Sequence, residues 1–313
     1  MPTLPAGGPG GPREDACRRH DLADAEWAVL EPLLPRGKKP GRPRKWPLRD
    51  LVDAIRWRVR CGCPWRDVPA CYGPWKSAYD LFRRWQRSGA WAAVVTGLQA
   101  LADAAGHVTW DVSVDSTIAR AHQHAAGARK DGTAQKEPPG GTGAPEPPDH
   151  ALGRSRGGWT TKAHLAVEEG QKPLAVIVTA GQRGDSPQFI PVLGAIRVPR
   201  PAGGRPRTTP CRVRADKAYS ARANRRHLRG RGITCTIPER SDQARNRKAR
   251  GSHGGRPPAF DSEDYKKRAS VENGICRLKR NRAVATRYDK LAVRYEATLH
   301  IAIMGEWLQP LAI

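Results

Sequence analysis

Apolar residues recur at helical spacing through the first hundred residues of the chain. Trp27, Leu30 and Leu34 follow one another at intervals of three and four residues before a proline ends the run. The same period recurs in residues 47–59, 75–87 and 90–105. Seven of the ten tryptophans lie in this part of the chain at helix-face spacing, which favours core packing over base stacking. Residues 21–105 are therefore predicted to form a small all-helical module.

From about residue 108 the pattern changes to short β-rich segments that alternate with helices. The predicted strands are VTWDVSVDST, KAHLAVE, PLAVIVTAG, RVRADKAY and ITCTIP, and the predicted helices lie near residues 187–196, 220–230, 262–280 and 291–308. This order predicts an α/β domain with a mixed sheet over residues 106–310. Stretches rich in Gly, Pro or basic residues predict flexible loops at about 125–158 and 240–260, and a disordered tail over residues 1–20.

The charge of the chain narrows the possible partners. Lys and Arg total 55 against 30 Asp and Glu, which gives a formal net charge of +25. An excess of this size favours attraction to nucleic acid or to an anionic membrane. The membrane alternative is disfavoured, because no stretch approaches the length of uncharged apolar sequence that spans a bilayer. The first 20 residues hold no apolar segment typical of a secretory signal, so we expect a cytoplasmic, nucleoid-associated protein without a membrane partner.

Two basic segments of the helical module are candidates for DNA contact. In residues 75–87, Arg83 and Arg84 lie opposite the apolar face, which fits either a helix-turn-helix role or a solvated basic surface. The loop RGKKPGRPRKWP contains Arg42 and Arg44, for which general phosphate contact is favoured over base readout. These four arginines are predicted to bind DNA.

Three carboxylates stand out against this basic background. Asp115 ends the apolar strand VSVDST, and Asp216 follows the strand RVRA. Sites in open α/β sheets gather beyond the carboxyl ends of the strands, so the two aspartates could converge. Glu272 lies on the border of the apolar face of the helix near 262–280. Three such side chains would suit a pair of Mg²⁺ ions, whereas each one alone is more typical of a cap or a surface ion pair.

The residues around these acids resemble the transposases of the insertion sequence five family, a DDE-type group from bacteria. The resemblance runs from about Leu22 to Leu308, through LADAEWAVLEPLLP, GRPRKWPLRDLVDAIRWRVRCGCPWRDVPACYGPW, VDSTIARAHQHAAGARK and ADKAYSARANRRHLRGRGITCTIPER. Its most specific part is the spacing Tyr, two residues, Arg, three residues, Glu, six residues, Lys. The residues Tyr265, Arg268, Glu272 and Lys279 match that spacing without a gap.

The resemblance implies a ribonuclease-H-like catalytic core preceded by a helical module that binds DNA or builds a dimer. Asp115, Asp216 and Glu272 are then the catalytic residues and the ligands of Mg²⁺, for which Mn²⁺ substitutes. The implied enzyme binds the terminal inverted repeats of its own insertion sequence, cleaves the DNA and joins the 3′-hydroxyl ends to target DNA by transesterification. Its implied partners are double-stranded DNA and further copies of itself, as a homodimer or a larger synaptic assembly.

The same resemblance places Tyr265, Arg268 and Lys279 on the DNA side of the site. Around the glutamate the chain departs from the family pattern, with Ala269, Ser270 and Asn273 as the local residues. Two alternatives therefore stand beside the transposase: a catalytically inactive DNA-binding relative, and a metal-dependent nuclease built on the same core.

Overall fold

The computed structural model describes residues 20–36, 45–128 and 145–312. Its first part is helical, with α2 (Asp24–Leu30), α3 (Leu48–Cys61), α4 (Trp75–Arg87) and α5 (Ala90–Ala104). The strands are β1 (Asp111–Ala121), β2 (Gly153–Ser155), β3 (Gly158–Glu168), β4 (Pro173–Ala180), β5 (Arg212–Ala215), β6 (Thr234–Thr236) and β7 (Thr286–Arg287). The later helices are α6 (Gln123–Ala126), α7 (Phe189–Gly194), α8 (Arg222–Gly230), α9 (Ser241–Ala249), α10 (Ser262–Lys266), α11 (Ala269–Lys279), α12 (Arg282–Ala285) and α13 (Ala292–Leu308).

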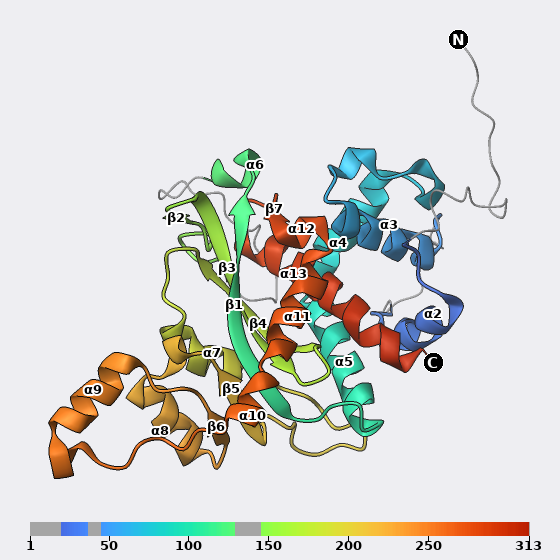
Figure 1. The fold of residues 1–313 in the computed structure, drawn as a ribbon. Helices are drawn as coiled ribbons and strands as arrows, with labels where there is room; N and C mark the ends of the chain where they lie inside the picture. Colours follow the sequence, from blue (N-terminus) through green and yellow to red (C-terminus); the bar gives the residue numbers. More distant parts are fainter. Residues whose placement is uncertain (1–19, 37–44, 129–144, 313) are drawn as a thin grey trace.

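The sheet is mixed, and its central strand is β1 (Figure 1). Strand β3 pairs antiparallel with β1 on one side and with β4 on the other, while β5 pairs parallel with β1 and β6 pairs parallel with β5. This meander followed by two parallel strands is the ribonuclease-H-like arrangement, and the helical unit precedes it, which confirms the predicted fold class. Strands β1, β4, β5 and β6 consequently end at the same edge of the sheet.

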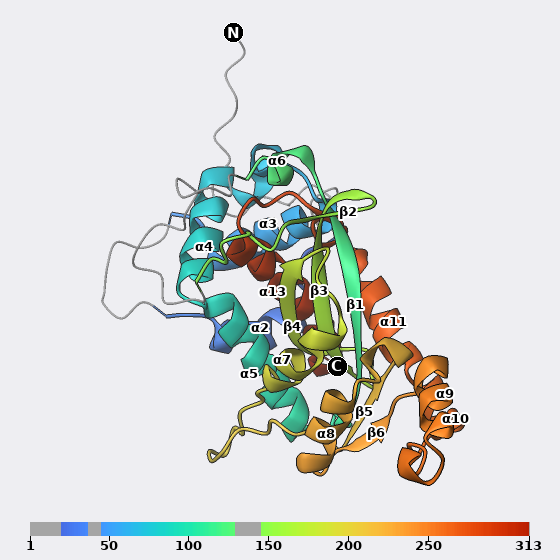
Figure 2. The same ribbon diagram turned by 90° about the vertical axis from the view of Figure 1, so that its left-hand side faces the viewer.

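Helices cover both faces of the sheet. Helix α11 packs on β1 and β3, and α13 packs on β4 and against α5, whereas α7 packs on β3 and β4 from the other face (Figures 1 and 2). The carbonyl of Pro173 accepts hydrogen bonds from Gln99 Nε2 at 3.0 Å and from Trp307 Nε1 at 2.8 Å, so it joins α5 and α13 to the start of β4. One hydrophobic cluster of buried residues therefore extends from the helical unit into the sheet.

Most of the predicted elements are present, with several differences. Strand β1 continues to Ala121, beyond its predicted end at Thr117, and β5 ends at Ala215, before the predicted end of that strand at Tyr219. The region predicted as one helix near 262–280 consists of α10 and α11, which meet at Lys267 and Arg268. The basic segment predicted as a loop contains α9, which has no buried residue and therefore carries no apolar period that a sequence pattern could reveal. The packing of the tryptophans is confirmed, since Trp85 and Trp91 are buried and the other five in this unit pack against the core. Among the described helices, none combines the length and apolar character needed to cross a membrane.

Candidate active site

Asp115 and Asp216 lie side by side at one edge of the sheet. Val114 and Ala215 are register partners in the parallel pair β1 and β5, and each aspartate is the next residue along its chain. Asp115 Oδ1 accepts the Ser116 N–H at 2.8 Å, and Asp216 Oδ1 accepts the Ala218 N–H at 2.7 Å. Each carboxylate is therefore held by a backbone N–H of the residues that follow it, within β1 for Asp115 and in the turn after β5 for Asp216.

Glu272 joins the two aspartates from the first turn of α11. Arg268, one turn earlier, donates from Nη1 to Asp115 Oδ2 at 3.1 Å and from Nη2 to Glu272 Oε1. The glutamate is 53% exposed, and the guanidinium stands between it and the aspartate. In residues 20–36, 45–128 and 145–312, no three His, Cys, Asp or Glu side chains are grouped closely enough to hold a metal ion as they stand. Arg268 thus links Asp115 to Glu272, and Asp216 lies next to Asp115 in the sheet.

The electrostatics of this group follow from partial burial among like charges. Burial raises the pKa of Asp115, and nearby Asp216 raises it further, while the Ser116 N–H and Arg268 oppose the rise. Burial by itself would lower the pKa of Arg268, but Glu272, Tyr265 and Asp115 raise it above its ordinary value. The arginine is therefore a permanent cation at the centre of the candidate site.

The remaining residues of the spacing motif lie along the same helices. The ring of Tyr265 lies 5.7 Å from the Arg268 guanidinium carbon and 5.3 Å from the ring of Phe260. Lys279 Nζ donates to the carbonyl of Ile118 at 3.1 Å, and burial lowers the pKa of this lysine. All four residues of the motif therefore belong to α10, to α11 or to the junction between them.

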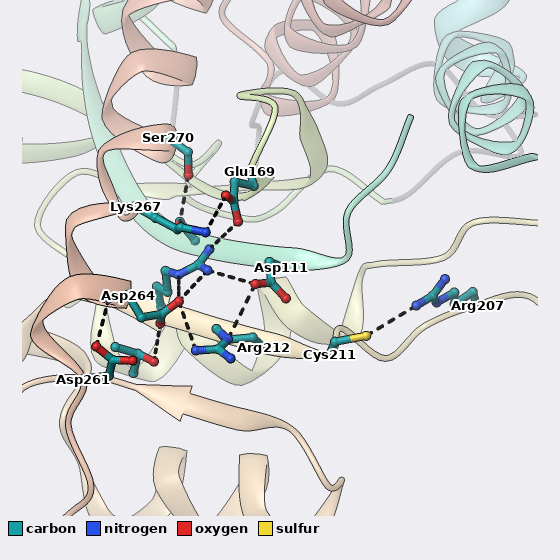
Figure 3. Close-up of polar contacts among 12 residues, drawn as sticks. Asp111, Glu169, Arg207, Cys211, Arg212, Asp261, Asp264, Lys267 and Ser270 are labelled. Carbon is teal, nitrogen blue, oxygen red and sulfur yellow. Dashed lines mark hydrogen bonds and ion pairs between the residues drawn. The ribbon is translucent and has the colours of Figure 1, made fainter. Parts of the chain in front are cut away.

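The position of α10 is fixed by a buried arginine that the sequence reading did not single out. Arg214 of β5 is 1% exposed and donates to Asp264 Oδ1 from Nε at 3.0 Å and from Nη2 at 2.6 Å. It also donates to Asp111 Oδ2 at 2.8 Å and to Glu169 Oε2 at 3.3 Å. Figure 3 shows these three carboxylates gathered from β1, the turn after β3, and α10. Burial opposes ionisation of Asp264, but hydrogen bonds from Arg214, Thr236 and Arg212 lower its pKa to about 2.

Helix α11 is docked by small residues. The hydroxyls of Ser270 and Ser113 are 3.1 Å apart and buried, which ties the helix to β1. A Cβ added at Gly274 would lie 2.8 Å from the carbonyl oxygen of Gln171 and 3.1 Å from Val167 Cγ1. Ser270, one of the departures from the family pattern, thus serves the packing that presents Glu272.

A fourth carboxylate near the site, Asp185, was missed by the sequence reading. It lies in the turn between β4 and α7, and its Oδ1 accepts the Ser116 hydroxyl at 2.7 Å and lies 3.0 Å from Lys162 Nζ. Burial would raise its pKa, but the bonds from Ser116 and Lys162 lower it. A signal was present, since β4 ends at the same edge as β1 and β5, and the strand-exit rule that selected Asp115 and Asp216 applies to it as well.

Two of the arginines predicted to bind DNA lie away from the acids of the site. Arg83 and Arg84 belong to α4, in the helical unit, and Arg83 donates to Gln86. Arg84 is exposed. Neither forms a hydrogen bond or an ion pair with the described acidic residues of the site. Arg42 and Arg44 lie outside the described residues.

Comparison with known proteins identifies the class to which this chain belongs. Residues 22–95 match a family described as "Putative transposase of IS4/5 family", and residues 106–304 match the family "Transposase DDE domain". The second match covers more than half of the chain, so the chain belongs to the DDE transposases, as its motifs predict.

Two of three individual relatives are named as transposases. "Uncharacterized protein y4sN" of Sinorhizobium fredii is 36% identical over 109 residues, which are 35% of this chain and 83% of that protein. "Putative transposase for insertion sequence element IS402" of Burkholderia cepacia is 35% identical over 98 residues, 31% of this chain and 46% of that protein. A transposase of the same description for element IS6501, from Brucella ovis, is 29% identical over 150 residues, 48% of this chain and 99% of that protein.

Solved structures give a more distant match. The Mos1 strand transfer complex is 11% identical with a TM-score of 0.24, over 77% of this chain and 78% of that chain. A pre-cleavage Mos1 transpososome is 12% identical with a TM-score of 0.24, over 89% of this chain and 82% of that chain.

Proposed function

We propose that this transposase binds the terminal inverted repeats of its own insertion sequence, cleaves the DNA and joins the 3′-hydroxyl ends to target DNA. The observation that carries the proposal is that Asp115 in β1 lies next to Asp216 at the end of the parallel strand β5, with Glu272 beside them on α11. Double-stranded DNA is the partner, and synapsis of two ends favours a homodimer or a larger assembly. The division into a helical module over residues 21–105 and a catalytic domain over 106–310 belongs to the same proposal.

The donor set suits a hard divalent cation, with Mg²⁺ as the cofactor and Mn²⁺ as its substitute. Asp115, Asp216 and Glu272 offer only carboxylate oxygens, the ligands that these ions prefer. Each aspartate has one oxygen already fixed by a backbone N–H, and Glu272 is exposed enough to turn toward them. When bound, such ions activate an attacking oxygen and stabilise a leaving oxygen at phosphorus.

The surrounding cations position the DNA in this proposal. Arg268 and Lys279 stand on either side of Glu272 on the same helices, and Tyr265 stacks on Arg268 and limits its movement. An arginine in this place can bind a phosphate with two parallel hydrogen bonds, which fixes the orientation of the scissile strand. Arg42, Arg44, Arg83 and Arg84 are proposed to hold the DNA farther along through the helical module.

A cleavage assay tests the proposal. The protein is expected to cut a duplex that carries the terminal repeats when Mg²⁺ or Mn²⁺ is present. Asp115→Asn, Asp216→Asn and Glu272→Gln are each expected to abolish this cutting, while binding to the DNA ends persists. Glu263→Gln, which removes a 77% exposed carboxylate of α10, is the control and should cut normally. Tight end binding without cutting in either metal would identify a catalytically inactive relative, and cutting without joined products would identify a nuclease.

A further inference from the structure

The face of the sheet opposite Glu272 carries a second polar group directly behind Asp115. Side chains alternate along a strand, so Ser116 points to the other face from its neighbour Asp115. The register of β1 and β3 puts Ser116 opposite His164 and Ile118 opposite Lys162. Asp185 reaches the same place from the turn after β4, 69 positions along the chain from Ser116.

Ser116 connects the two carboxylates through its backbone and its side chain. Its N–H donates to Asp115 Oδ1 at 2.8 Å, and its hydroxyl donates to Asp185 Oδ1 at 2.7 Å. The hydroxyl bond restrains the residue whose peptide group orients Asp115. Because Ser116 connects Asp115 to Asp185 through these two hydrogen bonds, movement of either carboxylate is transmitted to the other.

Lys162 supplies the positive charge that offsets the negative charge of Asp185. Its side chain is 12% exposed, and its ammonium lies 3.0 Å from Asp185 Oδ1 and donates to the carbonyl of Arg183 at 2.9 Å. His164 is the other basic group nearby, with Nδ1 3.7 Å from the same oxygen. Burial lowers the pKa of this histidine to about 4, so it is neutral near pH 7 and the lysine is the counter-ion.

Tyr219 is a buried residue whose pKa responds to all three aspartates of this region. Its side chain is 1% exposed, and burial together with Asp115, Asp185 and Asp216 raises its pKa. Three negative charges therefore act on one buried hydroxyl. A cluster of this kind needs fixed hydrogen bonds and a cation to keep its carboxylates in place.

We propose that Asp185, linked by Ser116 and neutralised by Lys162, is a positioning residue that holds Asp115 in the orientation required for metal binding. This inference rests on the proposed function, because it concerns a carboxylate that the proposal makes a metal ligand. Outer groups that orient metal ligands typically contribute a factor of about 10 to 100 in metal affinity or activity. Loss of the Ser116 hydroxyl, the Asp185 carboxylate or the Lys162 ammonium should therefore weaken metal binding without removing a ligand.

The test measures Mn²⁺ affinity of the full-length protein by isothermal titration calorimetry, alongside cleavage of repeat-bearing DNA. Asp185→Ala, Ser116→Ala and Lys162→Met are each expected to weaken Mn²⁺ binding and to slow cleavage by about 10- to 100-fold. Ser116→Thr keeps the hydroxyl and should restore near wild-type affinity, which a loss of packing alone would not explain. The double variant Ser116→Ala with Asp185→Ala should lose no more than the stronger single variant, since both break one bond.

A matched control exists in the same pair of strands. Lys172 has a side chain that is 13% exposed and lies 3.3 Å from Glu168, at the opposite end of the β3 and β4 hairpin. Lys172→Met should leave Mn²⁺ affinity unchanged. Wild-type affinity and cleavage in Asp185→Ala and Lys162→Met would overturn this inference alone, whereas wild-type protein that binds no Mn²⁺ and cuts no DNA would overturn the proposed function.

Discussion

Arg268 is the residue on which the candidate site converges. It contacts Asp115 and Glu272 with two different nitrogens and lies over the ring of Tyr265. A planar guanidinium has five donors in a fixed fork, whereas a lysine ammonium is a compact point charge on a flexible stem. The geometry at this position therefore requires arginine itself rather than any positive charge.

Arg268→Lys tests this requirement. The substitution keeps the charge but cannot reach both carboxylates in one conformation, so we expect DNA cleavage to fall by at least about tenfold while the affinity for duplex DNA changes by less than about threefold. Arg277 on the same helix is the control, because it also makes two bonds, to Glu306 at 2.6 Å and to Gln309 at 2.8 Å, away from the acids. Arg277→Lys should retain cleavage. Equal losses in both variants would contradict the assignment.

His164 gives a second prediction at this scale, on stability. Its folded-state pKa of about 4 lies below the unfolded value of 6.5, so the unfolded chain binds more protons between these values. The stabilisation from keeping this histidine neutral is present above pH 6.5 and is lost as the pH falls toward 4. Urea unfolding of the wild type should show this loss, and His164→Gln should reduce it by up to about 3 kcal/mol. An unchanged pH dependence in His164→Gln would contradict this prediction.

Individual residues were predictable where they follow a local rule. Asp115 and Asp216 each come directly after an apolar run, although β1 continues past Asp115 to Ala121, and Glu272 belongs to a spacing within one stretch of the chain. Arg214 gave no such signal, because it reads as one more arginine in a basic chain. Its partners Asp111 and Asp264 lie 103 and 50 positions away, and only the folded sheet brings them together.

At the scale of elements, helix α11 holds Glu272 beside the aspartates. It is tied to β1 by the Ser270 and Ser113 hydroxyls, and it follows α10, which Arg214 fixes through Asp264. The break between α10 and α11 lies beside Arg268, so the arginine sits where the chain turns from one helix to the next. Apolar periodicity predicts a continuous helix here because the period runs through both pieces.

Close approach of α11 to the turn after β3 gives a prediction at this scale. Gly274→Ala would put its Cβ 2.8 Å from the backbone carbonyl of Gln171, so the helix must shift. We expect a loss of about 1 to 3 kcal/mol in unfolding free energy and slower cleavage, because Glu272 lies on the same helix. In Gly194→Ala at the end of α7, the added Cβ meets no atom within 4 Å, and stability should be unchanged or slightly higher. Equal stability of both variants would argue against tight docking.

On the scale of the whole molecule, the helical unit and the sheet share one hydrophobic core. Periodicity predicted most helices and strands of both parts but gave no information about their packing, since Gln99 and Trp307 meet Pro173 from 74 and 134 positions away. The charge was likewise visible only as a total of +25. The structure shows that the carboxylates gather on the side of the sheet where β5 ends. The basic residues can then be compared by how close they lie to that side.

Helix α9 is the basic element that leaves from this edge. It follows β6, which is parallel to β5 and ends at the same side of the sheet, and it projects from the body of the molecule (Figure 1). It buries no residue, so its fold contributes nothing to the core. Arg245, Lys248 and Arg250 are exposed on it or directly after it and form no ion pair with a described residue. A polar helix with unpaired cations is suited to contact with DNA phosphates.

The salt dependence of DNA binding measures this contribution. Each phosphate contact adds about 0.9 to the steepness with which log affinity falls against log salt. Replacing Arg245, Lys248 and Arg250 together with Gln removes roughly three such contacts, so the slope should become shallower by about 2 to 3. The control removes the same charge from the segment that enters β5 at the opposite edge, by replacing exposed Arg197, Arg200 and Arg205 with Gln. If DNA lies along the edge that carries the acids, only the first variant changes the slope, whereas equal changes would mean that the net charge of the protein acts without regard to position.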